Sequence, residues 1–285
     1  MNEEARIKRL LLDTMAVSAL RQVLDVAREA GGIAVPVKGV VLSRWLYAAV
    51  VERPYRDLDV LVGRDALVPL TNAVRERGWR MRHLSVEMGE LEFEVDGFVV
   101  EVHAEFGRRD LSRLSTAEVI ARAVPDRETF PFEILRVDDI DHFFLLVANV
   151  TKKAYIYANR HQPEDLERFL LRLAPRWEEL AERARRASFL TATRNVAAWM
   201  ASEHGSATFT RFLRSLPAHP RRLLPAVVKL HRRLADRRGK RLETVSGLLG
   251  LALATLTADD WLLRGRGLAR LVRRGLYRRL GRDPG

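Results

Sequence analysis

The residues best suited to chemistry are acidic residues placed at strand spacing. Asp57 and Asp59 are two residues apart in the run Asp-Leu-Asp-Val-Leu-Val. Glu101 and His103 have the same spacing in Val-Glu-Val-His. Residues two apart in a β-strand project from one face, so each pair points one way. Carboxylates that share a face repel one another and require a cation or basic side chains nearby. If the two strands pair, three carboxylates converge, and such hard oxygen donors bind Mg²⁺.

A second group of residues is basic and precedes the acidic ones. Lys38 and Gly39 follow a short apolar run, and Arg53 lies four residues before Asp57. A helix that begins at Gly39 would present free backbone N–H groups to phosphate, with Lys38 as an added cation. Each feature alone also has a plainer interpretation. The Asp-x-Asp pair is also typical of a half-buried strand with a polar face, and Lys-Gly of a strand end followed by a helix. Arg53 could merely neutralise Asp57. A lone histidine such as His103 is more often structural than catalytic. Their order and spacing together favour a functional site.

The hydropathy pattern predicts alternating helices and strands around these residues. Apolar residues at helical spacing predict helices over 4–30, 39–47 and 64–77, and glycines follow the first and third. Strand patterns cover 33–37, 57–62, 79–84, 90–95 and 98–106. Asp96-Gly97 separates the last two strands and is a strong hairpin signal.

The pattern changes near residue 115 and becomes helical. One short strand is expected over 132–137. Helices are expected over 138–155, 163–173, 176–186, 190–202, 223–234, 242–256 and 259–280. The expected fold class is therefore α+β, with a sheet and flanking helices followed by an all-helical part. We expect two domains, 1–115 with the N-terminal helix and 116–285.

Composition narrows the classes of protein that fit. The 285 residues are 47% hydrophobic and 30% charged, as in ordinary globular proteins. There is no cysteine, which excludes disulfides and thiol chemistry and fits a reducing cytoplasm. The longest apolar stretch, 248–256, is far shorter than the roughly 20 residues of a membrane span. We expect a soluble, cytoplasmic protein without a transmembrane segment. The net charge of +12 favours an anionic partner or reflects an arginine-rich composition.

The stretch over 30–110 resembles the uncharacterised nucleotidyltransferase family of the polymerase-β-like superfamily. The residues that carry the likeness are Val-Lys-Gly-Val-Val-Leu at 37–42, Tyr47, Arg-Pro-Tyr-Arg-Asp-Leu-Asp-Val-Leu-Val at 53–62, Gly-Trp at 78–79 and Glu-Val-His at 101–103. The resemblance implies a polymerase-β-like mixed sheet with flanking helices. It also implies an Mg²⁺-dependent enzyme, with one or two ions. Such an enzyme transfers a nucleoside monophosphate from a nucleoside triphosphate such as ATP.

The resemblance also implies a role for each matching residue. Asp57, Asp59 and Glu101 would be the catalytic metal ligands, with Glu101 as the base for the acceptor hydroxyl. Lys38 and Gly39 would face the triphosphate. Arg53 and His103 complete the nucleotide- and phosphate-binding group. Arg53 would orient the metal carboxylates or touch phosphate, and His103 would lie behind the metal ligands or on the acceptor side. The acceptor would be a hydroxyl or similar group on a small molecule, peptide or protein.

Departures from the family pattern keep two alternatives open. Val40 follows Gly39 where the wider superfamily often has serine, and Glu101 replaces aspartate. These changes are consistent with a weakened homologue that binds nucleotide without turnover. The other alternative is a basic RNA-binding or RNA-modifying protein. Arginines and leucines over 261–282 follow helical spacing, and this basic amphipathic helix would pack on the protein, bind nucleic acid or lie on an anionic membrane surface.

Overall fold

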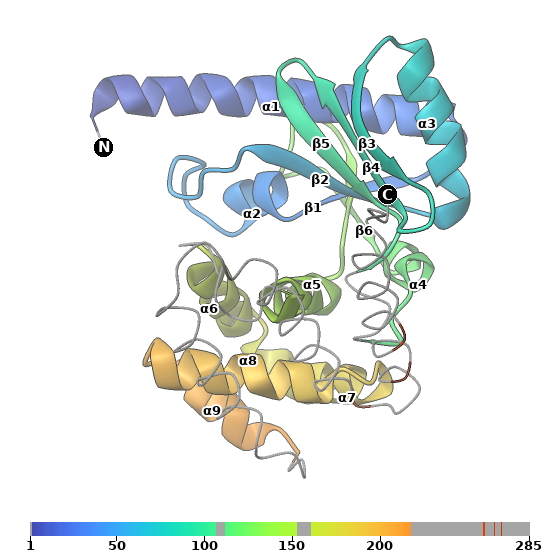
Figure 1. Cartoon of the computed structure of the whole chain (residues 1–285). Coiled ribbons are helices and arrows are strands. Elements are labelled where there is room, and N and C mark those ends of the chain that lie inside the picture. The colour runs from blue at the N-terminus through green and yellow to red at the C-terminus, as the bar shows by residue number, and fades with distance from the viewer. Residues whose placement is uncertain are drawn as a thin grey trace, which may run out of the picture. The chain divides into compact units, whose positions relative to one another are not determined.

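The computed structural model describes residues 2–106, 112–152 and 161–217, together with residues 259, 265 and 269 (Figure 1). The chain forms two compact units. One comprises Met1–Phe106 and Ser115–His142, and the other comprises Gly107–Leu114 and Phe143–Gly285. Residues 116–142 therefore belong to the first unit, whereas the sequence grouped them with the helical part. The division into domains at residue 115 itself stays a prediction.

The first unit contains a five-stranded sheet in the order β1-β2-β5-β4-β3. The strands are β1 (Ala34–Val37), β2 (Asp57–Val62), β3 (Arg80–Ser85), β4 (Glu90–Val95) and β5 (Phe98–His103). β2 and β5 pair in parallel, and the other neighbours pair in antiparallel fashion. The sheet is therefore mixed, as the expected α+β fold class requires. In the parallel pair, Asp59 lies opposite Glu101.

One face of the sheet is covered by helices and forms the core of the first unit. Alternate residues of the central strands point into it, among them Leu58 and Val60 of β2 and Val100 and Val102 of β5. Helices α1 (Glu3–Glu29) and α3 (Leu67–Glu76) contribute to the same cluster. The first turns of α1 extend beyond the sheet (Figure 1). The side chains between the core positions point to the opposite face, where the acidic residues of interest lie.

The hairpin between β4 and β5 has the turn that its sequence predicts. Asp96 and Gly97 have φ angles of 49° and 81°. Two successive positive φ values define the tight turn that matches the twist of paired strands. The turn fixes Val95 opposite Phe98 and thereby the pairing of the whole hairpin.

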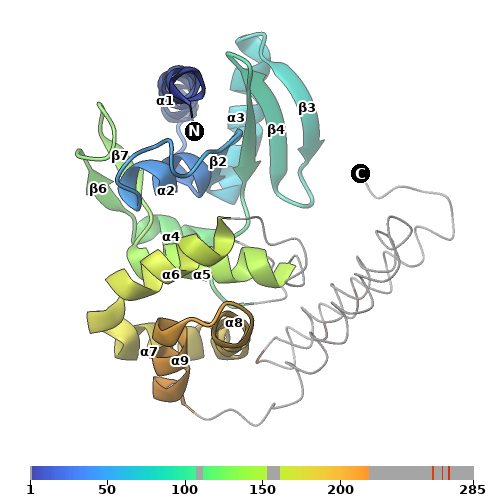
Figure 2. The ribbon, with the colours of Figure 1, turned by 90° about the vertical axis from the view of Figure 1, so that its left-hand side faces the viewer.

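Two short elements of the first unit were not expected. Helix α4 (Thr116–Ala121) begins with a capping box in which Ser115 and Glu118 satisfy each other's backbone groups. Strand β6 (Val124–Asp126) pairs with β7 (Ile134–Arg136), where the sequence predicted one strand over 132–137. This hairpin packs next to β1, away from β3 (Figure 2). A helix of six residues and a strand of three have too few positions for their periodic patterns to appear.

The regular elements in the described part of the second unit are all helices. Helix α5 (Asp139–Lys152) leads into it from the first unit. The other elements are α6 (Gln162–Arg172), η2 (Ala174–Arg176), α7 (Trp177–Arg186), α8 (Leu190–Glu203) and α9 (Ala207–Ser215). The rings of Phe143, Phe209 and Phe212 pack together in its core. Asp259 accepts hydrogen bonds from the backbone N–H groups of Leu190 and Thr191 and so caps α8.

Several expectations concern residues outside those described. Apart from residues 259, 265 and 269, the helices expected over 223–234, 242–256 and 259–280 lie there, as does the basic amphipathic helix over 261–282. Helix α9 was not expected. Among the helices of the described ranges, none combines the length and apolar character that crossing a membrane requires.

A buried ionic network ties α1 to the segments that flank the site. The Asp13 carboxylate accepts a 2.8 Å hydrogen bond from the Tyr55 hydroxyl and forms an ion pair with Arg44. Arg44 belongs to α2 (Gly39–Trp45), and Tyr55 lies just before β2. Asp13 is 7% exposed, so water cannot replace these partners.

Replacing Asp13 with alanine is expected to lower the free energy of unfolding by about 3 kcal/mol, because it leaves a partly buried guanidinium without its carboxylate. Urea denaturation measures the change. The matched control is Asp25→Ala, which removes a solvent-exposed ion pair with Arg28 on the same helix. That control should cost less than about 1 kcal/mol. Equal losses in both variants would contradict the structural role of Asp13.

Candidate metal and phosphate site

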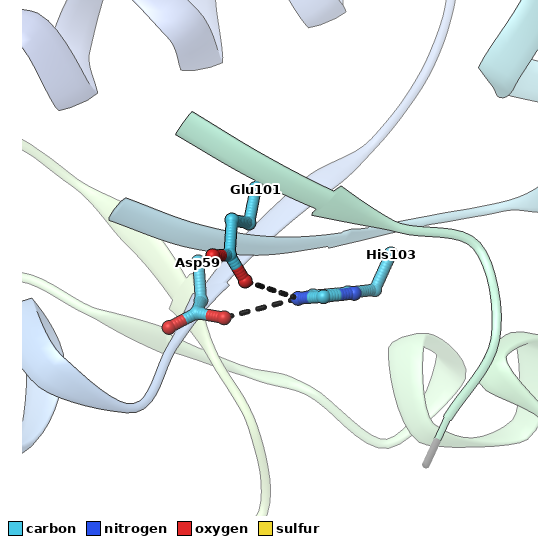
Figure 3. A group of neighbouring side chains, drawn as sticks. All are labelled: Asp59, Glu101 and His103. Atoms are coloured by element: carbon cyan, nitrogen blue, oxygen red, sulfur yellow. Dashed lines mark hydrogen bonds and ion pairs between the residues drawn. The ribbon is translucent and has the colours of Figure 1, made fainter. Parts of the chain in front are cut away.

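Three of the expected site residues meet on the face of the sheet opposite its apolar core, which is called the open face below. The Nε2 atom of His103 lies 3.0 Å from Asp59 Oδ1 and 3.6 Å from Glu101 Oε2 (Figure 3). Asp59 is 4% exposed, whereas Glu101 and His103 are half-buried. The parallel register brings them together, because it sets Asp59 beside Glu101, and His103 follows two residues later on the same face.

The spacing of these groups fits a shared cation. One ligand atom from each of Asp59, Glu101 and His103 lies within 4.8 Å of the other two. Neighbouring donors around an octahedral ion with bonds of about 2.1 Å are about 3 Å apart. The observed separations therefore require small side-chain adjustments to place all three donors around one ion.

The positively charged side chain of Lys38 lies in this acidic cluster. The Lys38 ammonium forms an ion pair with Asp59 Oδ1 and lies 3.4 Å from His103 Nε2. Its side chain is 21% exposed, and its partner is buried. In this conformation Lys38 neutralises the acidic cluster itself.

The acidic residues differ in how readily they ionise. Burial would raise the pKa of Asp59, but Lys38 and His103 outweigh this effect and lower that pKa to about 2. Burial raises the pKa of Asp57, and the negative charge of Asp59 adds to the rise. Burial and the charge of Asp59 also raise the pKa of Glu101. Asp59 is thus ionised at neutral pH, while Asp57 and Glu101 hold protons more tightly than ordinary carboxyls do.

The backbone at Lys38 adopts a conformation that non-glycine residues rarely adopt. Its φ and ψ angles are 53° and −126°. Such a conformation costs of the order of 1–3 kcal/mol and persists when the surroundings hold it. The Lys38 N–H donates a 3.2 Å hydrogen bond to Nε2 of His142. His142 lies at the start of α5 and is fully buried.

The neutral form of His142 makes this hydrogen bond possible. Burial lowers the pKa of His142 to about 3, and the positive charges of Arg136 and Arg53 add to the effect. At neutral pH the imidazole therefore carries a lone pair that can accept the Lys38 N–H. Sequence reasoning missed this residue. The available signal was a histidine beside Phe143 and Phe144 on the apolar face of a helix.

Gly39 begins α2, and its lack of a side chain is required. A Cβ atom at this position would lie 2.7 Å from Cβ of Tyr55 and 3.3 Å from Nη1 of Arg53. Arg53 is buried, and its charge acts on both Asp57 and His142. The structure therefore places Arg53 and Gly39 against one another at the turn that carries Lys38.

The fold is that expected of a nucleotidyltransferase, and a family comparison gives the same class. The chain belongs to the family described as uncharacterised nucleotidyltransferase, whose model matches residues 4–204. The match confirms the family expected from the sequence and makes the chain an enzyme of the nucleotidyltransferase class. A comparison with curated protein sequences finds no match.

The solved structures that resemble the chain are distant. The antibiotic-resistance factor ANT(2'')-Ia is 14% identical with a TM-score of 0.47, over 68% of this chain and 98% of that one. A tRNA nucleotidyltransferase complexed with a primer tRNA and an incoming ATP analog is 14% identical with a TM-score of 0.27, over 90% of this chain and 99% of that one. At these scores the likenesses carry no argument about the site or its substrates.

The buried neutral state of His142 predicts a pH dependence of stability. Below about pH 6.5 the unfolded chain protonates this imidazole, whereas the folded protein does so only near pH 3. The unfolded state thus binds more protons, and stability falls as the pH decreases through this window by about 1.4 kcal/mol per pH unit.

His142→Gln should remove this part of the slope, because glutamine keeps an acceptor for the Lys38 N–H but does not titrate. Urea denaturation of both proteins between pH 7.5 and pH 4.5 measures the difference. Parallel curves for the two proteins would show that His142 is not held neutral by the fold.

Proposed function

We propose that this enzyme transfers a nucleoside monophosphate from a nucleoside triphosphate to a hydroxyl or similar acceptor. The acceptor would belong to a small molecule, peptide or protein. One observation carries the proposal. The parallel pairing of β2 and β5 sets Asp59 beside Glu101, with Asp57 on the same face. Family membership supplies the reaction class.

In this proposal Asp57, Asp59 and Glu101 would hold one or two divalent cations, expected to be Mg²⁺. Such a cation would supply positive charge for the phosphate oxygens and the leaving group. Asp59 remains ionised and provides the firmest anchor. Glu101 lies beside Asp59 on the neighbouring strand and would take the proton of the acceptor hydroxyl. The acceptor oxygen bonds to the α-phosphorus, and the bond from that phosphorus to pyrophosphate breaks.

The basic residues at the turn serve the phosphates. Lys38 forms an ion pair with Asp59. Once a metal ion neutralises the carboxylates, the flexible lysine side chain would turn from Asp59 and bind a phosphate oxygen. Arg53 lies beside the same turn and adds a second positive charge. His103 shares the open face with Glu101 and thus borders the space where the nucleotide would lie.

A weakened homologue that binds nucleotide without turnover is the second candidate function. The ion pair between Lys38 and Asp59 favours it, because this pair occupies a metal-binding oxygen. Val40 also lacks the hydroxyl that the turn often has in the wider superfamily. Cytoplasmic location and the identity of ATP as substrate stay predictions. So does nucleic-acid binding through residues 261–282.

Asp59→Asn should lower the rate of pyrophosphate release by at least about 100-fold, because the amide is a weaker metal ligand and carries no charge. The assay follows pyrophosphate formed from a mixture of nucleoside triphosphates with divalent cation and candidate acceptors. Full activity in this variant would refute the mechanism. Nucleotide binding without turnover in the wild-type protein would favour the second candidate.

The matched control for Asp59→Asn is Glu94→Gln on β4. Glu94 lies on the open face of the same sheet, opposite Val99, and pairs with Arg80. This substitution removes one carboxylate charge from the same face without touching the cluster. The activity of the Glu94→Gln protein should stay within about twofold of wild type. The ion pair that it loses contributes little to stability, and the acidic cluster is unchanged.

Lys38→Met should have opposite effects on the two ligands of the site. Divalent cations should bind more tightly in the absence of nucleotide, because the competing ammonium is gone. The KM for nucleoside triphosphate should rise by about tenfold or more, because a phosphate contact is lost. Isothermal titration calorimetry and steady-state kinetics measure these changes.

Lys8→Met is the control for Lys38→Met, because Lys8 is an exposed lysine on α1. Lys8→Met should change neither the affinity for divalent cations nor the KM for nucleoside triphosphate. Weaker cation binding in Lys38→Met would show that the ammonium does not compete for the metal position.

A further inference from the structure

His103 points into the acidic cluster in a way that its expected role in phosphate binding does not require. Its Nε2 atom faces both Asp59 Oδ1 and Glu101 Oε2, and the three side chains converge from two strands (Figure 3). The imidazole is half-buried and lies on the same β5 face as Glu101. A ring nitrogen at this place is a donor for whatever cation the two carboxylates hold.

We propose that His103 is a direct metal ligand and that the ion held by Asp59, Glu101 and His103 is a first-row transition-metal ion such as Mn²⁺ rather than Mg²⁺. This inference rests on the proposed function, because it concerns one of the same metal positions. The two carboxylates supply oxygen donors, and His103 supplies one nitrogen donor.

The chemistry of the donor set distinguishes these ions. Mg²⁺ prefers carboxylate, carbonyl and water oxygens, whereas imidazole nitrogen suits first-row transition metals. Mn²⁺ accepts both kinds of donor. A mixed set of two carboxylates and one imidazole therefore binds Mn²⁺ more tightly than Mg²⁺. A set of oxygen donors alone discriminates less between the two ions.

The surroundings of His103 permit ligation. The Lys38 ammonium lies 3.4 Å from Nε2 and is paired with Asp59, so a positive charge already occupies the place where these donors meet. A divalent cation replaces that charge when the flexible lysine side chain withdraws. Without a metal ion, Nε2 donates a 3.0 Å hydrogen bond to Asp59 Oδ1. When the ring proton moves to Nδ1, His103 presents the Nε2 lone pair to the ion.

The test is the environment of bound Mn²⁺ in the full-length protein, read by pulsed electron paramagnetic resonance without nucleotide. We expect a ¹⁴N coupling to Mn²⁺ in the wild-type protein, replaced by a ¹⁵N coupling when the protein is labelled with ¹⁵N-histidine. Wild-type protein suffices for this measurement, so it does not depend on the folding of a variant. Bound Mn²⁺ without nitrogen coupling would overturn the proposal.

Two variants assign the nitrogen. His103→Asn should abolish the coupling and reduce the preference for Mn²⁺ over Mg²⁺ from at least about tenfold to about threefold or less. His83→Asn replaces an exposed histidine on β3 and should leave both unchanged. A coupling that survives in His103→Asn would overturn the proposal.

The outcome is separate from that of the proposed function. Nitrogen-coupled Mn²⁺ in a protein that transfers no nucleotide would retain the metal assignment and refute the activity. Metal-dependent nucleotide transfer without a nitrogen coupling would retain the activity and refute the assignment.

Discussion

The parallel pairing of β2 with β5 sets Asp59 beside Glu101, and the arrangement of the site follows from that register. A slip of one residue would turn the acidic side chains of one strand into the core, because side chains alternate between faces. The pairing also concentrates negative charge, which would oppose folding in the absence of a counter-charge. The ammonium of Lys38 supplies that charge from the turn after β1. The ion pair with Lys38 thus stabilises the cluster in the absence of metal, and the same carboxylates can bind a divalent cation in its place.

The opposite face of the same strands holds the register in place. Leu58, Val60, Val100 and Val102 are buried between the sheet and the helices that cover it. Burial of each such side chain contributes about 1.5–3 kcal/mol, and a shifted register would lose several of these contributions together. The apolar face therefore positions the charged face. The free energy of this apolar burial offsets the repulsion between the acidic side chains on the other face.

Local patterns in the sequence predicted most of the first unit. The bounds of β2 and β4 agree with those expected, since alternation and the Asp96-Gly97 turn are visible in neighbouring residues. The convergence of Asp59 with Glu101 was an expectation that depended on strand pairing. The contact of Lys38 with His142 could not be predicted, because 104 positions separate the two residues and no pattern links them. The roles of the site residues remain predictions of the proposed mechanism.

Anomalous diffraction from crystals grown with Mn²⁺ and a non-hydrolysable nucleoside triphosphate tests most directly whether this cluster holds a metal ion. We expect an anomalous peak about 2.2 Å from carboxylate oxygens of both Asp59 and Glu101, with the Lys38 ammonium moved from Asp59 towards the phosphates. Ordered nucleotide without a peak at these carboxylates, and with Lys38 still paired to Asp59, would contradict it.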